Sequence, residues 1–525
     1  MTTRKRLLLS GALLPLALAL PLQCNKENPG SDGQDMGGID PTADLSGTGT
    51  GDGGGGGGDG GGSTMDLMTT DLLLLGVTPA TGPSTGMSGG SPVVLDVSGA
   101  NFVAGMQVLI GGQMAVVDQV VSSSLIKVRL PAKLGTKGPV DVEVRHPDTR
   151  KVTRTDLFRY YYGNVALTLQ GTKLDIGTRP WAISIADLNN NMNPDIVVVN
   201  RSSNDLVAVM GNGDGTFGTV PATPPKTSAM GGPNPTGLAL GDMNKDGFLD
   251  AIACNESVPS VAVLLNNQAG VFSRNNEYSV GSTPQAVVGA DLNGDMIFDA
   301  LTANAGGNNA SLLYGAAASA FTTPATMLTP GGAAQSPSSL ALIDLNKDNK
   351  PDLVLVNQMT SNVSVFLWND TTKAFEWKAN YQTGANTNPR GVTVGDFIGD
   401  GNVDVAVSLG LAAPQILIMA GDGTGALGTG TLHPVSANNG DAPLGMASAD
   451  FDGDGTPDIV TALSGSTGIA LVLNRNKMPQ PAIFISTGKN PQALAVGDLD
   501  KNGKPDVAVA NTGDNQVAIL LNTSQ

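Results

Sequence analysis

The chain has 525 residues, of which 70 are Gly and 32 are Pro, while only 14% are charged and 4% aromatic. Globular proteins average about 7% Gly and about 25% charged residues, so this composition favours short strands and turns over helical bundles. Two Cys and two His exclude a disulfide framework and a His- or Cys-based metal cluster. The net charge of −17 disfavours general nucleic-acid binding.

Residues 1–23 predict an export signal. Arg4-Lys5-Arg6 precede the apolar run Leu7–Leu22, which is shorter than the ~20 residues that cross a membrane. Cys24 closes the run, and the segment before it resembles a bacterial lipoprotein processing site. Lipidation of Cys24 would anchor the protein at the outer membrane or cell surface, whereas cleavage after Ala17-Leu18-Ala19 would give a secreted or periplasmic soluble protein.

Residues 24–70 predict a disordered linker. Asp, Gly, Ser and Thr dominate it, and 10 of the 12 residues from Gly51 to Gly62 are Gly. Such a segment has too little apolar surface to offset the entropy of ordering it. We expect a spacer that holds the folded part away from a membrane.

Residues 71–162 predict a small β-sandwich. Short apolar runs alternate with turns at a spacing typical of that architecture: Val93–Val97, Gln107–Ile110, Ile126–Leu130 and Val140–Val144. The order of Val77-Thr78-Pro79, Ser98–Phe102 and the closing Phe158-Arg159-Tyr160 resembles the IPT/TIG immunoglobulin-like family. A basic cluster surrounds one predicted hairpin and is either a partner patch or a solvated hairpin: Arg145, Arg150, Lys151, Arg154 and Arg159.

Residues 163–525 contain seven repeats. Their Asp-rich segments follow one another at intervals of 48 to 55 residues, and a Pro stands seven residues before each one; they start at Asp187, Asp242, Asp291, Asp344, Asp396, Asp450 and Asp498. Two apolar runs follow each segment, so each repeat offers about four short strands. A single such sheet cannot bury its own faces, and fixed-period repeats of this kind predict a seven-bladed β-propeller.

The closure of the ring is also predicted. The chain ends after the third strand of the seventh repeat, and Val165–Ile176 supplies a spare strand before the first Asp segment. We expect this strand to complete the last blade. The repeats resemble the FG-GAP/VCBS family, the repeat type of integrin α-subunit propellers and many bacterial surface proteins. The predicted fold class is therefore all-β, an immunoglobulin-like sandwich followed by a seven-bladed propeller.

The Asp segments predict structural Ca²⁺ sites. In repeat six, Asp450, Asp452, Asp454 and Asp458 occupy the first, third, fifth and ninth positions around Gly455. This spacing wraps oxygen ligands around one hard cation and resembles the first half of an EF-hand loop, and the glycine permits a left-handed turn. Ordinary Asp-Gly turns are the alternative. The repeat region has 31 acidic and 16 basic residues, an excess that several Ca²⁺ ions would offset.

The seven loops differ in completeness. Full ligand sets predict strong sites in repeats two, six and seven: Asp242, Asn244, Asp246 and Asp250; the repeat-six residues above; and Asp498, Asp500, Asn502 and Asp506. Repeat four has a fair set with Asn349 in the glycine position: Asp344, Asn346, Asp348 and Asp352. We expect weak or empty sites in the rest: Asp187, Asn189, Asn191 and Asp195; Asp291, Asn293, Asp295 and Asp299; and Asp396, Asp400 and Asp404. Met192 and Met296 strain two of these turns, and Ile398 removes an oxygen from the third.

The sequence predicts no catalytic machinery. His433 is expected in a loop without companions, and Cys254 reads as a small buried residue. Two kinds of binding protein remain, besides a structural envelope role: an adhesion scaffold for a protein partner, or a lectin-like propeller that uses Trp181 or Trp368. In either case the ligand is expected on the rim opposite the Asp loops: Asn200–Asp205, Asn255–Ser260, Asn304–Asn309, Asn357–Asn362, Leu409–Pro414, Ser464–Gly468 and Asn511–Gln516.

Overall fold

The computed structural model describes residues 10–12 and 72–524, except for residues 89–90, 134–136, 164, 172, 219–231, 317–319, 333–334, 411–412, 437 and 439. Cys24, the linker and most of the expected export signal lie outside the described residues. Of that signal, only the short strand β1 (Ser10–Ala12) is described, and it pairs antiparallel with β18 (Pro235–Gly241). Within the described part of the chain, no helix is long and apolar enough to cross a membrane.

The first domain is a two-sheet sandwich. One sheet has the order β2 (Leu73–Thr78), β6 (Val94–Ala100), β10 (Leu125–Arg129), β9 (Val116–Ser122); the other has the order β3 (Thr81–Pro83), β12 (Lys151–Tyr161), β11 (Gly138–Arg145), β7 (Gln107–Ile110), β8 (Gln113–Met114). Alternate side chains of these strands face inward and are fully buried, among them Leu95, Val97, Val142 and Val144. This period-two pattern is that of strands with one face on a core and one in solvent.

The basic cluster lies on the hairpin of β11 and β12, and much of its charge is paired there. Glu143 contacts both Arg145 and Lys151, and these two partners lower the pKa of the Glu143 carboxyl to about 2. Arg150 pairs with Asp148 at 2.8 Å. Such pairing is what a solvated hairpin shows.

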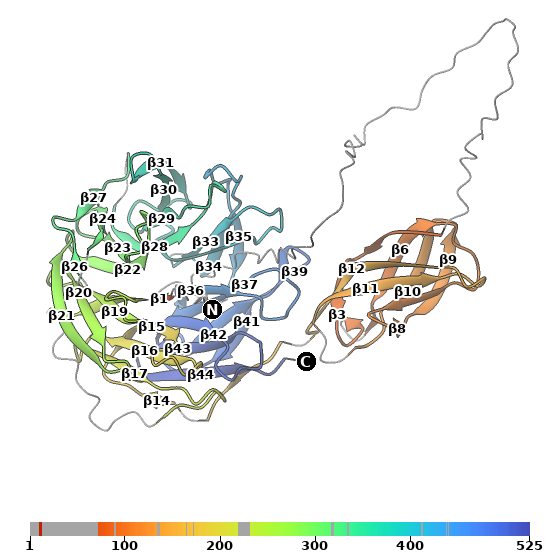
Figure 1. Ribbon diagram of the computed structural model, residues 1–525, viewed down its shortest axis with the longest axis horizontal. Helices are drawn as coiled ribbons and strands as arrows, with labels where there is room; N and C mark the ends of the chain where they lie inside the picture. Colours follow the sequence, from red (N-terminus) through yellow and green to blue (C-terminus); the bar gives the residue numbers. More distant parts are fainter. Residues whose placement is uncertain are drawn as a thin grey trace, which may run out of the picture. The chain divides into compact units, whose positions relative to one another are not determined.

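Seven antiparallel sheets follow, and Figure 1 shows them arranged around a common centre. Blade one consists of β15 (Pro180–Ala186), β16 (Asp195–Asn200) and β17 (Asp205–Val209), and blade two of β18 (Pro235–Gly241), β19 (Asp250–Asn255), β20 (Ser260–Asn266) and β21 (Phe272–Ser279). Blade three consists of β22 (Pro284–Ala290), β23 (Asp299–Asn304), β24 (Asn309–Leu313) and β27 (Thr326–Leu328). Blade four consists of β28 (Pro337–Ile343), β29 (Asp352–Asn357), β30 (Asn362–Asn369) and β31 (Ala374–Gln382).

Blade five consists of β32 (Pro389–Gly395), β33 (Asp404–Leu409), β34 (Gln415–Met419) and β35 (Thr431–Pro434). Blade six consists of β36 (Ala442–Ala449), β37 (Asp458–Ser464), β38 (Gly468–Val472) and β41 (Ile483–Ser486). Blade seven consists of β42 (Pro491–Gly497), β43 (Asp506–Asn511), β44 (Gln516–Asn522) and β13 (Leu167–Leu169). The predicted all-β class, a sandwich followed by a seven-bladed propeller, is confirmed. One detail differs: His433 lies in β35 and not in a loop, because its segment supplies the outer strand of blade five.

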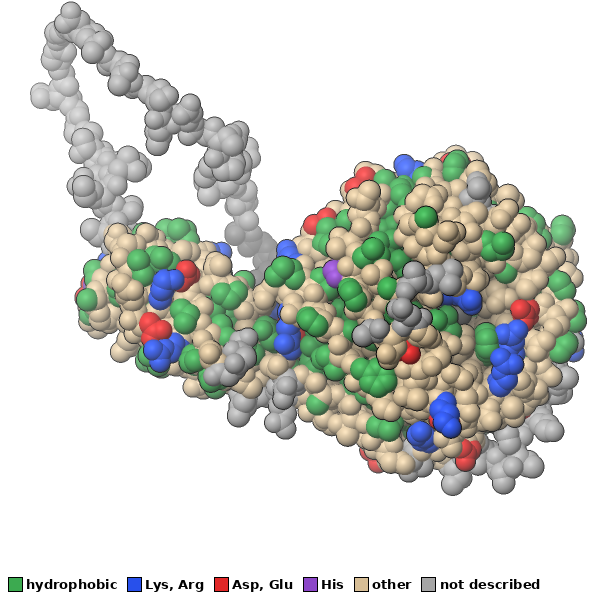
Figure 2. Space-filling view, turned by 180° about the vertical axis from the view of Figure 1, so that it is seen from behind, with side chains coloured by type: hydrophobic (Ala, Val, Ile, Leu, Met, Phe, Trp, Pro, Cys, Tyr) green, Lys and Arg blue, Asp and Glu red, His purple; other side chains and the backbone are tan. Residues whose placement is uncertain are grey.

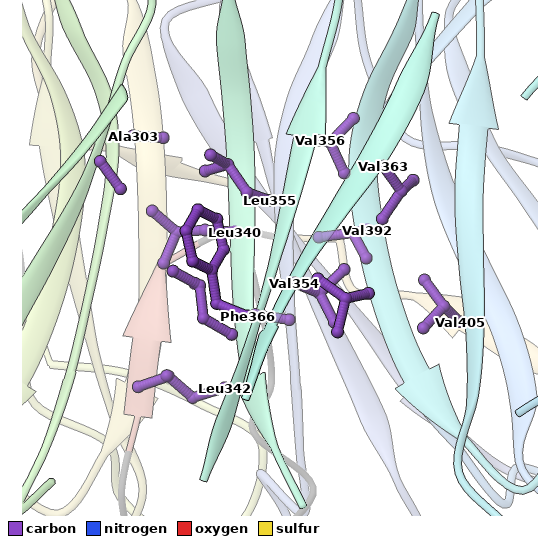
Figure 3. Close-up of a cluster of buried hydrophobic side chains, with 14 of the residues drawn as sticks. Ala303, Leu340, Leu342, Val354, Leu355, Val356, Val363, Phe366, Val392 and Val405 are labelled. Carbon is purple, nitrogen blue, oxygen red and sulfur yellow. The ribbon is translucent and has the colours of Figure 1, made fainter. Parts of the chain in front are cut away.

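The propeller core lies between the blades. The second strand of each blade is buried along its length, as β29 illustrates, except for the half-buried Ser464 at the end of β37. Figure 3 shows Leu355 and Val354 of this strand with Leu340 and Phe366 of the same blade and Val392 of blade five, all in one cluster of buried side chains. Each blade therefore depends on its neighbours to bury its apolar faces.

The two ends of the propeller region join in blade seven. Leu167, Thr168 and Leu169 of β13 pair with Asn522, Leu521 and Leu520 of β44. The predicted completion of the last blade by the spare strand is confirmed. The short strand β14 (Leu174–Asp175) adds a second pairing with β44.

Candidate metal centres and the opposite funnel

All seven Asp loops lie at one end of the blades. Each loop connects the first strand to the second, which run antiparallel, as with β18 and β19. The turn from the second strand to the third, as between β19 and β20, therefore lies at the opposite end. The structure thus has an Asp-loop face and, across the ring, the face that carries the seven turns expected to meet a ligand.

The ninth-position aspartate of every loop is a fully buried hydrogen-bond hub. In blade two, Asp250 Oδ2 accepts from the Met243 N–H at 3.0 Å and Oδ1 accepts from the Asn266 N–H at 2.9 Å. The same paired bonds occur in all seven blades, with Asp195, Asp250, Asp299, Asp352, Asp404, Asp458 and Asp506 as acceptors. This residue fastens the loop to the end of the third strand.

Burial dominates the electrostatics of these hubs. Removal of water raises the pKa of Asp250, Asp299, Asp352 and Asp506 from the usual 3.8 to about 6, against the lowering effect of the backbone N–H donors. The neighbouring first- and fifth-position carboxylates raise the pKa of Asp250 further. Without a nearby positive charge, each loop therefore disfavours the ionised form of its own ninth-position aspartate.

The first-position aspartate separates the loops into two groups. In blades one to five its two oxygens accept the backbone N–H groups of the fifth and sixth positions, as Asp242 does from Asp246 and Gly247 at 3.0 and 2.9 Å. In blades six and seven one oxygen, Oδ1 of Asp450 and of Asp498, is buried and has no hydrogen-bond partner. These two loops leave buried carboxylate oxygens available to another ligand.

Carboxylates converge in the same two loops. Among the described residues, ligand oxygens of three carboxylates lie within 4.8 Å of one another in two places: Asp450, Asp452 and Asp454 in blade six, and Asp498, Asp500 and Asp506 in blade seven. Asp454, which is 3% exposed, adds a further buried and unpartnered oxygen, Oδ2. Blade two, whose sequence motif is equally complete, has no such cluster, and the strength of its site stays a prediction.

The blade-six loop is the most enclosed of the seven. Arg475 Nε pairs with Asp452 Oδ2 at 2.7 Å, and Asp452 is fully buried. The backbone N–H of Tyr162 donates to the Asp452 carbonyl at 2.6 Å. Burial and the Asp454 charge raise the pKa of Asp452 to about 7 even though Arg475 opposes this shift.

All seven loops use a left-handed residue at the sixth position. Glycine supplies it in blades two, five, six and seven, with φ between 79° and 90°. Met192, Met296 and Asn349 adopt the same conformation in blades one, three and four, with φ of 67°, 64° and 63°. The expected strain at the two methionines is therefore present, but the turn itself forms in every blade.

The opposite face contains a funnel at the centre of the ring, lined by both polar and apolar groups. Its cavity of about 440 Å³ is lined by residues from blades five, six, seven and one. An adjoining cavity shares Trp181, Arg390, Leu444 and Gln492 with it and is also lined by residues of blades three and four. The lining includes Trp181, Arg179 and Arg390 with the amides Asn388 and Gln492. Ser464 and Thr512 come from the turns that the sequence assigned to the ligand-facing rim.

The repeats aim these side chains by a shared rule. The first strand of each blade begins at or beside the Pro that precedes the Asp segment by seven residues. The residue after this Pro lines the funnel, as Trp181, Arg390 and Gln492 do. Residues before the Pro, such as Arg179 and Asn388, are left-handed, with φ of 57° and 51°, and also line the funnel. Sequence reasoning recorded the phased Pro but missed its neighbours, although their fixed offset was a readable signal.

Other residues singled out by the sequence lie elsewhere. Trp368 is 3% exposed and packs edge-on against Phe375 at 5.1 Å, so it is not available to a ligand, which corrects its place among the lectin candidates. Trp377 lies on the outer strand β31 and is exposed. Cys254 is buried, and burial raises the pKa of its thiol to about 11.

Together, the radial sheets and phased Asp loops define a β-propeller that follows an immunoglobulin-like sandwich. Family comparison specifies both parts: residues 187–253, 344–407 and 450–509 match the FG-GAP-like repeat, and residues 76–162 match the IPT/TIG domain. The protein is thus an FG-GAP-repeat propeller with an IPT/TIG domain, as the resemblance noted in the sequence indicated.

Solved structures resemble the chain only remotely. The BBS1N structure in complex with ARL6DN is 11% identical, with a TM-score of 0.47, over 67% of this chain and 96% of that one. Auxiliary nutrient binding proteins from Bacteroides ovatus and Bacteroides thetaiotaomicron are 11% and 12% identical, each with a TM-score of 0.38, over 86% of this chain and 98% and 97% of theirs. No curated protein sequence matches the chain. Likenesses this remote do not bear on function.

Proposed function

We propose that the protein is an exported, lipid-anchored surface protein whose calcium-stabilised propeller is a non-catalytic binding scaffold. The observation that carries the binding role is the concave funnel on the face opposite the Asp loops. Loops held by a rigid scaffold are where recognition concentrates, and a cavity of this size suits a small ligand or one unit of a larger one.

Calcium is the cation that the loops of blades six and seven fit. Ca²⁺ takes six to eight oxygen ligands in flexible geometry, and these loops combine converging carboxylates with buried oxygens that lack a partner. Two carboxylates whose ligand oxygens lie within 4.8 Å of each other repel by about 3 kcal/mol or more at an effective dielectric of 20. A bound ion would supply the missing positive charge and tie the loop to its blade.

The non-catalytic role is supported by the chemistry of the remaining groups. The Cys254 thiol is buried and protonated at neutral pH, since its pKa is about 11. His433 lies on an outer strand, and burial lowers the pKa of its imidazole. Neither group lines the funnel.

The surface location rests on the sequence alone, namely the export signal and Cys24. Mass spectrometry of the mature N-terminus tests it: a diacylated or triacylated Cys24 is expected. A mature chain that begins after Ala19 with an unmodified Cys24 would contradict the anchor and leave a soluble exported protein.

A membrane anchor requires no basic membrane-binding surface. On the face in Figure 2, Lys and Arg side chains form small separate patches between uncharged surface and scattered Asp and Glu. This pattern also offers little to nucleic acid, whose binding depends on clustered cations.

Site-specific photo-crosslinking tests the binding role. A photoreactive residue at Ser464, on the funnel rim, is expected to capture the ligand from the protein's native surroundings, whereas the same residue at Met296, an exposed position on the Asp-loop face that is not a ligand candidate, is the matched control. Equal capture from both faces, or none from Ser464, would contradict a ligand site on the funnel face.

A further inference from the structure

The funnel is positively charged in a strongly acidic protein. The chain carries 46 acidic and 29 basic residues, yet the described residues that line the funnel include Arg179 and Arg390 and no carboxylate. Within the described residues, neither of these two guanidiniums forms an ion pair with Asp or Glu. Two uncompensated positive charges in a cavity select for a negative ligand.

A tryptophan organises the positive side of the funnel. The guanidinium of Arg201 lies 4.2 Å from the centroid of the Trp181 ring, and that of Arg179 lies 5.6 Å from it. Arg201 is neutralised by its ion pair with Glu256, and Glu256 also accepts from Gln285 at 3.1 Å. The ring therefore supports two arginines, of which Arg179 keeps its charge available to the funnel.

Arg390 provides the second free charge in the lining of the same cavity. Its side chain is solvent-accessible within the funnel, while the surrounding protein removes enough bulk water to lower the pKa of its guanidinium. The Gln358 amide lies 3.0 Å from Arg390 Nη2 and 3.2 Å from Nε when its oxygen faces the guanidinium. This contact fixes the orientation of a planar group that binds carboxylates through two parallel hydrogen bonds.

The rest of the lining is rich in groups that both donate and accept hydrogen bonds. It contributes the amides Asn388, Asn490 and Gln492 and the hydroxyls Ser464 and Thr512, whereas the large apolar side chains are Trp181 and Leu444. Amides and hydroxyls match the hydroxyl groups of a sugar. A peptide ligand would instead draw on apolar pockets or on an open strand edge.

We propose that the funnel binds an acidic saccharide, with a uronate carboxylate held by Arg390 and Arg179 and the sugar hydroxyls held by the surrounding amides. This inference rests on the proposed binding function and specifies its ligand. The two guanidiniums fit one carboxylate rather than a densely charged polyanion, because the part of the lining that the structure describes carries two free positive charges.

Calorimetric titration of the full-length protein with short galacturonate oligomers tests the proposal. Binding is expected, and neutral galactose oligomers of the same length are expected to bind at least about tenfold more weakly, because they lack the charge-assisted contacts of the carboxylate. A sulfated galactose oligomer distinguishes carboxylate recognition from attraction to any anion. Equal affinity for the neutral, sulfated and uronate oligomers would overturn the proposal.

Variants localise the site. Arg390→Gln and Arg179→Gln are each expected to weaken galacturonate binding about tenfold or more, and Arg390→Lys to restore part of the loss. The matched control is Arg274→Gln on the outer strand β21, whose arginine pairs with Glu277 away from the funnel. Unchanged melting temperatures establish that each variant folds. Unchanged galacturonate affinity in both funnel variants would overturn the proposal.

The outcome also separates this inference from the proposed function. If galacturonate fails to bind while the crosslinker at Ser464 captures a protein, the saccharide inference fails and the scaffold role stands. If galacturonate fails to bind and Ser464 captures nothing, both fail. If galacturonate affinity is unchanged in the arginine variants but lost in Trp377→Ala, the saccharide binds at the outer strand β31, and this result would overturn the funnel site.

Discussion

The Asn266 backbone N–H donates to Asp250 Oδ1 at 2.9 Å, which joins the end of the third strand of blade two to its Asp loop. The Asn266 side chain continues the connection, because its Nδ2 donates to the Leu188 carbonyl in the loop of blade one at 2.8 Å. Asn474 and Asn522 repeat both bonds, towards Phe397 and Phe451 of the preceding blades. The ninth-position aspartate thus links loop, blade and neighbouring blade.

Replacement of a hub aspartate is expected to destabilise the propeller. Asp299→Asn leaves one oxygen to receive the two N–H groups of Leu292 and Gly315 and turns an amide N–H₂ towards a donor. An unsatisfied buried donor costs about 1–3 kcal/mol. Urea unfolding should show a loss of this size, with Asp295→Asn on the exposed part of the same loop as the control. Equal stability of the two variants would contradict the hub role.

The metal-free protein is expected to become more stable as the pH falls from 7 to 5. Four hub carboxyls have a folded-state pKa of about 6 against an ordinary value of 3.8. Between these values the folded state binds more protons than the unfolded state, so stability rises on acidification. Melting curves in chelator over this range measure the effect.

Calcium is expected to reverse this pH dependence. Protons compete with the cation for the same carboxylates, so the increase in melting temperature on adding Ca²⁺ should be largest at pH 7 and shrink towards pH 5. Asp498→Asn should reduce the increase at pH 7, because it removes a carboxylate of the blade-seven cluster. A melting temperature that does not change on adding Ca²⁺ at any pH in this range would refute the proposed ion sites.

The architecture was readable from the sequence because its determinants are periodic. Seven phased Asp segments predicted seven blades, and the missing last strand predicted the pairing of β13 with β44. Periodic patterns report the packing that each repeat needs from its neighbours. The sequence also identified position six as left-handed in every loop, including at Met296.

The site was only partly readable, because ligand geometry depends on contacts that the motif does not encode. Asp242 and Asp498 occupy the same motif position, yet only Asp498 has a buried oxygen without a partner. Arg475 approaches Asp452 from a different segment of the chain. The funnel could not be predicted for a related reason. Arg179 and Arg390 are 211 positions apart in the sequence, and they line the same cavity because the ring closes.

Substitution of Met296 by glycine is expected to stabilise blade three. Met296 has φ of 64° and is 80% exposed, so its side chain gives little packing in return for its left-handed backbone. That conformation costs an L-residue about 1–2 kcal/mol, which the glycine avoids. The greater flexibility of glycine in the unfolded chain reduces this gain in stability by about 0.5–1 kcal/mol. A net gain of about 0.5–1 kcal/mol should appear in urea unfolding.

The control for this prediction is Asn349→Gly in blade four. Asn349 has nearly the same φ of 63°, but asparagine tolerates the left-handed region, so the gain there should be smaller or absent. If Met296→Gly destabilised the protein as much as a glycine in an ordinary strand, the backbone at this position would not be strained.

Disruption of the strand that joins the two ends of the propeller is expected to open blade seven. The Gln170 backbone N–H donates to the Ile519 carbonyl at 2.8 Å, and Gln170→Pro removes this donor next to β13. A proline that deletes a backbone hydrogen bond costs about 3 kcal/mol in regular structure, whereas Gln170→Ala keeps the bond and serves as the control. Limited proteolysis should then cleave the Gln170→Pro variant between β13 and β15 faster than the control, and its melting temperature should fall. Because blade seven also packs against blade one through Ile183, Val198 and Ala508, the loss should spread to both blades. An unchanged cleavage rate would show that the ring is held shut by blade packing without the paired strand.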